Sequence, residues 1–206
     1  MLEATFYKNI FTDYISNFTS DYIATKYNNF SIDQKSFYSF MVENWDNSRY
    51  SGYIPREYTD STSIDQITLA SKIGYMADNT LKRDWGINPS HNNIFKDILG
   101  YDFFNLVNLN PDKTQIRLLC YEPGNMLPLH WDGYEAWQHK FNTKQVPIRY
   151  SVLVNNWSYG QYLQINNTVV TNWEAGDIYC IPNKILHCSG NGGIIPKVTL
   201  TITGTD

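Results

Sequence analysis

The chain has 206 residues, with 16 Lys and Arg, 20 Asp and Glu, and a formal net charge of -4 at pH 7. This length suits one domain with a substantial core. The basic residues are scattered along the sequence, which argues against a tight binding surface for a nucleic-acid backbone. The chain has neither a run of eighteen apolar residues nor a basic and apolar leader, so we expect neither a membrane span nor export.

The three cysteines, Cys120, Cys180 and Cys188, lie in or beside apolar, strand-like runs and show no C-x-x-C pairing. Their odd number and spacing predict small core side chains in a reducing compartment. We therefore expect a cytoplasmic protein without disulfides.

Residues 1–100 are predicted to be mainly helical. The tetrapeptide Ser-Ile-Asp-Gln occurs at 31–34 and again at 63–66, each time as a capping box whose Ser would begin a helix. A shorter helix is expected from Asn92 to Leu99 and would end at Gly100. The second box precedes an apolar stripe at three-residue steps, formed by Ile64, Ile67, Ala70, Ile73 and Met76. We expect these helices to pack on the part of the chain that follows.

Residues 101–206 are predicted to form a series of short strands, because β-branched runs alternate there with Gly, Pro and Asn. The expected strands are 102–109, 114–122, 128–132, 147–155, 161–165, 168–171, 176–181, 184–188 and 195–203. Short strands with this spacing are typical of a sandwich or jelly roll. The expected fold is mostly β with N-terminal helices, in one structural domain overall.

Three residues of the β region have the side-chain types of a metal site. In His130-Trp131-Asp132 the two outer residues would share one face of a strand, because side chains alternate along it. His187 follows at the end of a later apolar strand. Two imidazoles and one carboxylate form the facial triad expected for non-haem iron(II), with three positions left for a bidentate cosubstrate and dioxygen. For His187 alone, a hydrogen-bonded core histidine is the alternative.

The last predicted strand has one polar and one apolar face. Lys197 and Thr199, followed by two further threonines, alternate with apolar residues. In a barrel that holds a charged ligand, the polar face would point inward. Lys197 is the only cation on this face, so it is our candidate partner for the distal carboxylate of a cosubstrate, with Thr199 adding a hydroxyl. The alternative is an edge-strand lysine that discourages aggregation.

The segment from Tyr121 to Asp132, YEPGNMLPLHWD, resembles the Y-x-x-G-x-x-L-x-x-H-x-D signature of the 2-oxoglutarate and iron(II)-dependent dioxygenase superfamily. The segment from Trp173 to His187 resembles that superfamily's approach to its second histidine. Lys197 resembles the lysine of the prolyl 4-hydroxylase-like branch. This resemblance covers roughly residues 101 to 203.

The resemblance implies a double-stranded β-helix core of the jelly-roll, cupin-like kind at 101–206, buttressed by the helical region 1–100. It implies Fe(II) held by His130, Asp132 and His187, with 2-oxoglutarate and dioxygen as cosubstrates and hydroxylation as the reaction. Tyr121 would donate its hydroxyl to 2-oxoglutarate. A packed core aromatic is the alternative for this tyrosine.

Substrate contacts are predicted on one strand and one loop. Arg117 shares strand parity with Tyr121, so it would point inward, either toward an acidic substrate group or as the alternative anchor of the cosubstrate. Tyr134, Trp137 and His139 belong to an aromatic loop at 133–145, which would be a natural lid beside a metal. Packing at the solvent edge is the other role open to the loop residues.

The expected partner is a peptidyl substrate, including a prolyl one, or a small molecule. Nucleic-acid demethylases of the superfamily share the segment from Tyr121 to Asp132. This chain has Leu119 where they carry an asparagine and lacks their paired arginines, so we do not expect nucleic acid as a partner. From another class, the chain could be a cupin-like metal-binding or sugar-binding module without oxygenase activity. Asp132, in place of a third ligating histidine, opposes that alternative.

Overall fold

The structure, a computed structural model, describes residues 22–52, 81–86 and 88–206. The predicted capping box at 63–66 and the apolar stripe that follows it lie outside the described residues.

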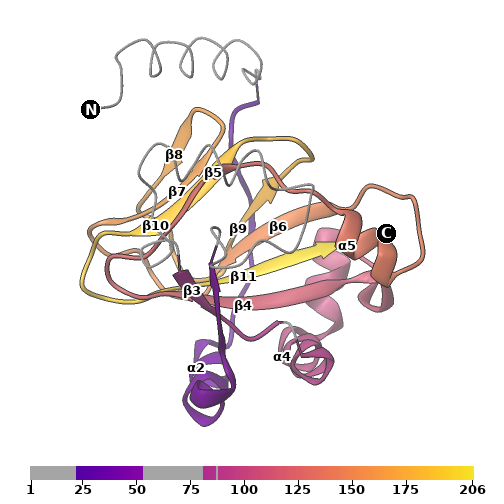
Figure 1. The fold of residues 1–206 in the computed structure, drawn as a ribbon, viewed down its shortest axis with the longest axis horizontal. Helices are drawn as coiled ribbons and strands as arrows, with labels where there is room; N and C mark the ends of the chain where they lie inside the picture. Colours follow the sequence, from indigo (N-terminus) through magenta and orange to yellow (C-terminus); the bar gives the residue numbers. More distant parts are fainter. Residues whose placement is uncertain (1–21, 53–80, 87) are drawn as a thin grey trace.

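Two antiparallel sheets form the body of the described chain (Figure 1). The larger sheet contains, in spatial order, β1 (Lys26–Asn29), β9 (Asp177–Ile181), β6 (Ile148–Leu153), β11 (Lys197–Gly204), β4 (Gln115–Tyr121), β3 (Leu81–Asp84) and β2 (Arg49–Gly52). The smaller sheet contains β5 (Met126–His130), β10 (His187–Asn191), β7 (Gln161–Ile165) and β8 (Thr168–Val170). From β4 onward the chain passes repeatedly between the two sheets. This is the double-stranded β-helix, or jelly roll, that the sequence predicts.

Two helices cover the outer face of the larger sheet. α2 (Gln34–Glu43) and α4 (Pro89–Val107) lie below β4 and β11 in Figure 1. They share one apolar core with the sheet, which includes Phe37, Phe40, Phe95, Phe103, Ile116, Leu118, Leu200 and Ile202. A third helix, α5 (Glu135–Lys140), and two 3-10 turns, η1 (Trp45–Asn47) and η2 (Pro111–Lys113), connect strands and helices. The helices α2 and α4 therefore buttress the barrel, as expected.

The alternation along β11 divides the interior into two different environments. Val198, Leu200 and Ile202 pack against the helices in the outer core. Lys197 and Thr199 point the other way, toward the smaller sheet, because successive side chains of a strand alternate between its faces. The space between the sheets is therefore partly polar, which is unusual for a barrel interior unless it receives a polar ligand.

The strand predicted at 102–109 is wrong, because these residues continue α4 to Val107. Phe95, Leu99, Phe103 and Val107 recur every four residues and bury one helical stripe in the outer core. Gly100 interrupts the helix with φ 68 and ψ 173, yet the helix resumes after it. Packing of this stripe outweighs the local tendency of the segment to form a strand.

The region expected to be mainly helical also supplies three strands. β1, β2 and β3 add to the two edges of the larger sheet. The capping box at 31–34 also acts differently from the prediction. Asp33 is the residue that caps α2, and its carboxylate accepts a hydrogen bond from the Ser36 N–H at 3.1 Å. A carboxylate is as good a cap as a serine hydroxyl, so the helix begins two residues later than predicted.

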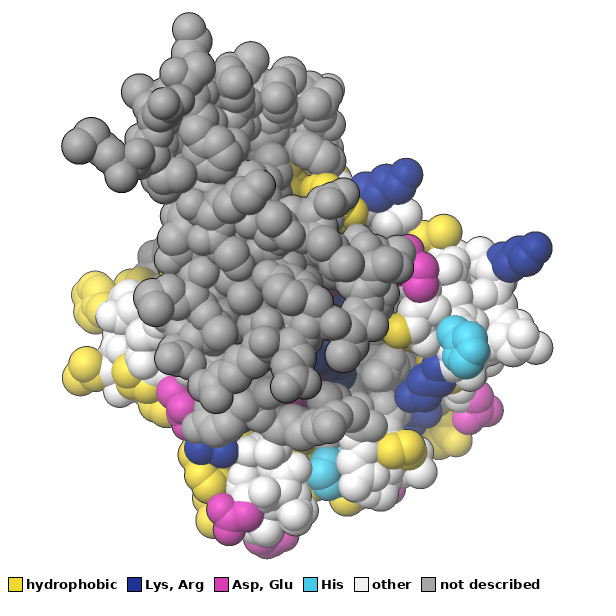
Figure 2. All heavy atoms as spheres, in the orientation of Figure 1, with side chains coloured by type: hydrophobic (Ala, Val, Ile, Leu, Met, Phe, Trp, Pro, Cys, Tyr) yellow, Lys and Arg dark blue, Asp and Glu magenta, His cyan; other side chains and the backbone are white. Residues whose placement is uncertain are grey.

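The described surface is mixed in character. On the face shown in Figure 2, acidic and basic side chains are interspersed. Within the described residues, every helix is too short or too polar to cross a membrane.

The outer core should tolerate truncation poorly. Phe95 is fully buried, and its ring contacts those of Phe40 (centroids 4.8 Å apart) and Phe37 (6.1 Å). We expect Phe95→Ala to lower the free energy of unfolding by about 3–5 kcal/mol, because it leaves a cavity between α4 and the sheet. The matched change Ile94→Ala removes a side chain from a residue that is 40% exposed, so it should cost about 1 kcal/mol or less. Urea denaturation of both variants measures the difference, and equal losses would contradict this picture of the core.

Candidate metal centre

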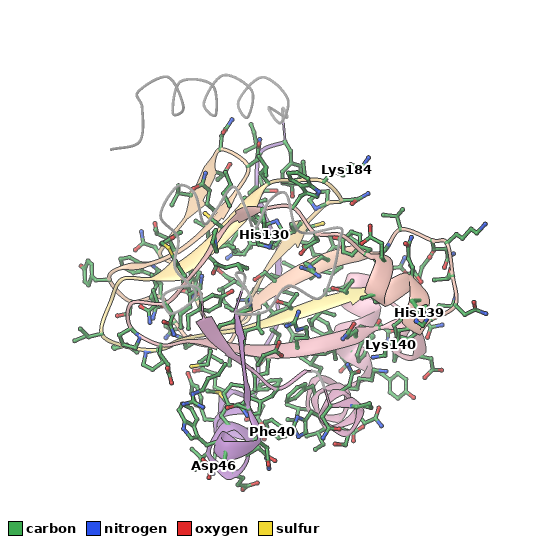
Figure 3. The ribbon with its side chains drawn as sticks, viewed as in Figure 1. Phe40, Asp46, His130, His139, Lys140 and Lys184 are labelled. Atoms are coloured by element: carbon green, nitrogen blue, oxygen red, sulfur yellow. The ribbon has the colours of Figure 1, made fainter. Side chains whose placement is uncertain are left out.

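The pairing of β5 with β10 brings two histidines together. His130 and His187 are direct cross-strand partners, and their ring centroids are 4.3 Å apart. Both residues are buried, and Figure 3 places His130 among the strands of the barrel. Cross-strand partners share a face of the sheet, so the register alone determines that both imidazoles point the same way.

The strand ends near the site differ from those predicted. β5 ends at His130, so Asp132 lies two residues beyond the strand, and strand alternation is not what positions it. His187 begins β10, whereas the sequence predicts that it ends a strand. A tight turn precedes it, in which Lys184 has φ 61 and the Ile185 N–H donates to the Pro182 carbonyl at 3.2 Å. That turn delays the start of the strand until His187.

Backbone carbonyls orient both imidazoles. Nδ1 of His130 lies 2.7 Å from the Pro128 carbonyl oxygen, and Nδ1 of His187 lies 3.0 Å from that of Ile185. A carbonyl oxygen can only accept, so each Nδ1 carries the proton and each Nε2 presents its lone pair. These Nε2 atoms lie 3.8 Å and 3.4 Å from the two carboxylate oxygens of Asp132.

Burial sets the protonation states that a metal ligand requires. Burial lowers the pKa of His130 to about 3 and also lowers the pKa of His187, so both rings are neutral near pH 7. Burial alone would raise the pKa of Asp132. The Arg149 guanidinium is the largest of the effects that oppose burial, and the net pKa of Asp132 is lowered. Two neutral imidazoles therefore face an ionised carboxylate.

One carboxylate oxygen of Asp132 is left for a cation. Oδ1 forms an ion pair with Nη1 of Arg149. Oδ2 is buried and has no hydrogen-bond partner among the described residues, although a buried acceptor in this position ordinarily has one. One ligand atom from each of His130, Asp132 and His187 lies within 4.8 Å of the others. These three residues can hold a metal ion, and their two nitrogens and one oxygen suit a divalent transition metal.

A buried lysine lies deeper between the sheets. Lys197 is 0% exposed, and its ammonium donates to the Ser189 hydroxyl at 2.6 Å and to the Tyr162 carbonyl. It also lies 5.5 Å from the ring centroid of Tyr121 and 5.0 Å from that of Trp173. β11 is flanked by β6 and β4, so the alternative of an edge-strand lysine is wrong. Burial lowers the pKa of Lys197 to about 7.

Tyr121 and Thr199 lie on the same inner face as this lysine. Tyr121 is the cross-strand partner of Lys197, is 2% exposed, and forms a side-chain hydrogen bond with Ser189. Burial raises its pKa, so the hydroxyl keeps its proton and can donate. Thr199 is 4% exposed and follows Lys197 on the same face of β11. The structure therefore brings together the three residues predicted to bind a cosubstrate.

The predicted substrate residues are placed differently from one another. Arg117 points inward, as parity predicts, but its Nε donates to Asp84 Oδ2 at 2.9 Å, so its charge is paired. Tyr134 lies beside the metal cluster, with the Arg149 guanidinium 5.6 Å from its ring centroid. Trp137 belongs to α5, where the sequence predicts a loop, and its ring packs on Phe141.

Tyr134 and Trp137 are both buried, at 6% and 3% exposure, which differs from the solvent-edge alternative. Within the described chain, the Tyr134 hydroxyl and the Trp137 indole N–H have no hydrogen-bond partner. His139, in contrast, is exposed and lies at the outer part of α5 in Figure 3. His139 therefore takes no part in the metal cluster.

Sequence reasoning missed four charged or polar residues of this interior: Lys82, Asp84, Arg149 and Ser189. Ser189 was within reach of a parity argument, because it follows His187 by two residues on β10. Arg149 lies on the inner face of β6 by the same rule. Lys82 and Asp84 lie on β3, in a region expected to be helical, so the sequence offered no signal that they enter the barrel.

Comparison with known proteins supports the fold and extends no further. No family profile matches the chain, and no curated protein sequence matches it. Among solved structures, the chain is similar to the non-heme alpha-ketoglutarate-dependent epimerase SnoN from nogalamycin biosynthesis, with 7% identity, 84% of this chain and 72% of that chain covered, and a TM-score of 0.54. A predicted oxalate decarboxylase from Thermotoga maritima has 12% identity and a TM-score of 0.38, and the overlap covers 61% of this chain and 82% of that chain. A cupin-like protein from the same organism has 14% identity and a TM-score of 0.36, and the overlap covers 61% of this chain and 68% of that chain.

Loss of one imidazole should abolish tight metal binding. Losing only a hydrogen-bond partner of a metal ligand typically costs 10–100-fold in affinity. We therefore expect His130→Ala to weaken Co(II) or Fe(II) binding by more than about 100-fold, measured by anaerobic calorimetric titration of the metal-free protein. His139→Ala is the matched control, because it removes an exposed imidazole, and it should bind as the wild type does. Unchanged affinity in His130→Ala would show that the metal binds elsewhere.

Proposed function

We propose that this chain is a non-haem Fe(II) and 2-oxoglutarate-dependent dioxygenase that hydroxylates its substrate. The observation that favours this function most is Lys197, a fully buried lysine between the same two sheets that hold the His130, Asp132 and His187 cluster. A buried ammonium is costly to the fold unless it is compensated. A role in binding an anionic cosubstrate explains why the barrel retains it.

In this proposal His130, Asp132 and His187 hold Fe(II). When bound there, the iron supplies oxidative chemistry by activating dioxygen with electrons from 2-oxoglutarate. The distal carboxylate of 2-oxoglutarate binds the Lys197 ammonium, with which it can form a charge-assisted hydrogen bond. In the structure this ammonium donates to a serine hydroxyl and a backbone carbonyl, and neither of these groups neutralises its charge.

The other polar residues of the interior position the reactants. The Tyr121 hydroxyl and the Thr199 hydroxyl flank Lys197 and can donate to the same carboxylate. Arg149 keeps Asp132 ionised and restrains one of its oxygens. The apolar side chains of Leu153, Leu163 and Ile165 form part of the core that keeps water out of the space between the sheets.

A cupin-like metal-binding module without oxygenase activity is the second candidate, and the low-identity overlap with cupin-like structures concerns the fold alone. The carboxylate of Asp132 and the buried ammonium of Lys197 favour the oxygenase. Hydroxylation of a peptidyl substrate, including a prolyl one, follows from the resemblance of Lys197 to the prolyl 4-hydroxylase-like lysine. A small molecule is the other substrate class. Nucleic-acid demethylation is disfavoured, because the chain has Leu119 on β4 and an acidic composition.

The proposed function predicts a spectroscopic signal. Addition of 2-oxoglutarate to the anaerobic Fe(II) protein should produce a weak metal-to-ligand absorption band, because the chelated keto acid accepts charge from the metal. Admission of oxygen should then release succinate. Asp132→Ala should show neither signal. A wild-type protein that binds Fe(II) yet gives no band with 2-oxoglutarate would support the binding module instead.

Lys197 should couple 2-oxoglutarate binding to proton uptake. Its pKa of about 7 leaves it mostly neutral at pH 8, while a bound carboxylate favours the charged form. Binding should therefore take up to one proton per 2-oxoglutarate at pH 8 and almost none at pH 6, and affinity should fall as the pH rises above 7. Calorimetry in buffers of different ionisation enthalpy measures this uptake.

Two lysine variants test whether Lys197, and not another titrating group, takes up the proton when 2-oxoglutarate binds. Lys197→Met should bind 2-oxoglutarate at least about tenfold more weakly, a loss of about 1.4 kcal/mol, and should take up fewer protons than the wild type. Lys144→Met removes an exposed lysine and should match the wild type. Wild-type affinity and proton uptake in Lys197→Met would mean that another group binds the cosubstrate.

A further inference from the structure

A second buried lysine points into the barrel from β3, the strand next to the β2 edge of the larger sheet. Lys82 lies on β3, which pairs with β4 through Arg83–Cys120 and Asp84–Leu119 (Figure 1). Leu119 has the parity of the inner face of β4, so Asp84 is inward-facing. Lys82, two residues earlier, faces the same way. It is 7% exposed, and the two carboxylates that act on it electrostatically, Asp84 and Asp132, are ion-paired with arginines.

The carboxylates near Lys82 are already engaged by other groups. Asp84 accepts from the Arg117 guanidinium through Oδ2 and from the Gly86 N–H, at 2.9 Å, through Oδ1. Asp132 is paired with Arg149. Each of these two arginines therefore has its own carboxylate, and Lys82 forms no ion pair within the part of the chain that the structure describes. A buried ammonium without an anion costs the fold several kcal/mol, unless a ligand supplies the missing charge.

Lys82 acts close to the metal cluster. Its charge contributes to lowering the pKa of both His130 and His187, and it interacts electrostatically with Arg117, Asp84, Arg149 and Asp132. Burial and the nearby Arg117 guanidinium lower its own pKa to about 7, and the opposing effect of the Asp84 and Asp132 carboxylates is smaller. A ligand group that paired with Lys82 would therefore sit beside the metal ligands.

Lys82 and Lys197 occupy separate positions on the inner face of the larger sheet. Continuing the β3–β4 register places Lys82 opposite Tyr121, whose partner on the other side is Lys197. The two lysines are thus two strands apart, with backbones about 10 Å from each other. The Lys197 ammonium is hydrogen-bonded to Ser189 and Tyr162 of the smaller sheet, whereas the charged groups that act on Lys82 are Arg117, Asp84, Arg149 and Asp132.

We propose that Lys82, with Arg117 beside it, binds a carboxylate of the primary substrate, and that this substrate is a small carboxylic acid such as a free amino acid. This inference rests on the proposed function, in which Lys197 takes the distal carboxylate of 2-oxoglutarate. An internal peptide segment has a neutral backbone and would leave Lys82 without its counter-ion. The second lysine therefore favours a small acidic substrate over a prolyl peptide.

Paired probes test the charge requirement directly. We would titrate the twenty free L-amino acids and a series of straight-chain aliphatic acids, each against its primary amide, into the anaerobic Fe(II) protein by ligand-observed NMR, with and without 2-oxoglutarate. At least one acid should bind at least tenfold more tightly than its amide. In Lys82→Met the acid and its amide should bind with about equal affinity. Lys82→Arg should retain part of the preference for the acid, and Lys144→Met should leave this preference unchanged. The proposal is overturned if no acid outbinds its amide, or if the preference survives Lys82→Met.

Stability separates a ligand-binding lysine from a structural one. Lys82→Met removes an unpaired buried charge and keeps the apolar stem, so its urea midpoint should equal or exceed that of the wild type. A marked loss of stability would instead show that Lys82 supports the fold, and would contradict the proposal. The exposed Lys144→Met change should leave the midpoint unchanged.

The affinity for 2-oxoglutarate distinguishes the two proposals. It should change by less than about threefold in Lys82→Met and fall at least tenfold in Lys197→Met. A large loss in Lys82→Met alone would make Lys82 the cosubstrate anchor and overturn the inference. If the wild type binds no 2-oxoglutarate, the proposed function fails, while the acid and amide titrations without 2-oxoglutarate still decide whether Lys82 binds a carboxylate.

Discussion

The requirement that a charge buried between two sheets must be compensated shapes the whole interior of this barrel. The inner face of the larger sheet presents Lys82, Asp84, Arg117, Arg149 and Lys197 where a barrel of this size would ordinarily hold apolar side chains. Two arginine–carboxylate pairs neutralise part of this charge. The two lysines have no carboxylate partner in the described chain, and the desolvation of each costs the fold several kcal/mol. A ligand with at least two anionic groups, or two ligands, would remove that cost.

The apolar material that stabilises the fold lies mainly on the other side of the larger sheet. α2 and α4 bury a dense set of phenylalanines against the outer faces of β4 and β11. A fully buried side chain of this size contributes about 1.5–3 kcal/mol by removal from water, so this core can offset the polar interior. The apolar and the polar side chains lie on opposite faces of the sheet because side chains alternate along each strand, so that one strand such as β11 supplies both faces.

The metal cluster depends on the same architecture. The register of β5 with β10 sets the two imidazoles side by side, and backbone carbonyls fix their tautomers. Asp132 is held from a different sheet by Arg149. The three candidate ligands all come from the smaller sheet or the residues just after its strand β5, and the Arg149–Asp132 ion pair links them to the larger one.

The sequence by itself predicted most strand positions and a sandwich or jelly roll, because strand alternation and turn residues are local properties of the chain. Its resemblance to the dioxygenase superfamily narrowed this to a jelly roll with His130, Asp132 and His187 as candidate metal ligands. The sequence also identified Lys197 as an inward cation, since one strand displays both faces in its residue pattern. Only the tertiary structure decided the rest. α4 replaced a predicted strand because its apolar stripe found a sheet to pack on, and Lys82 entered the barrel because β3 paired with β4. Such outcomes depend on contacts between distant segments, which no local pattern encodes.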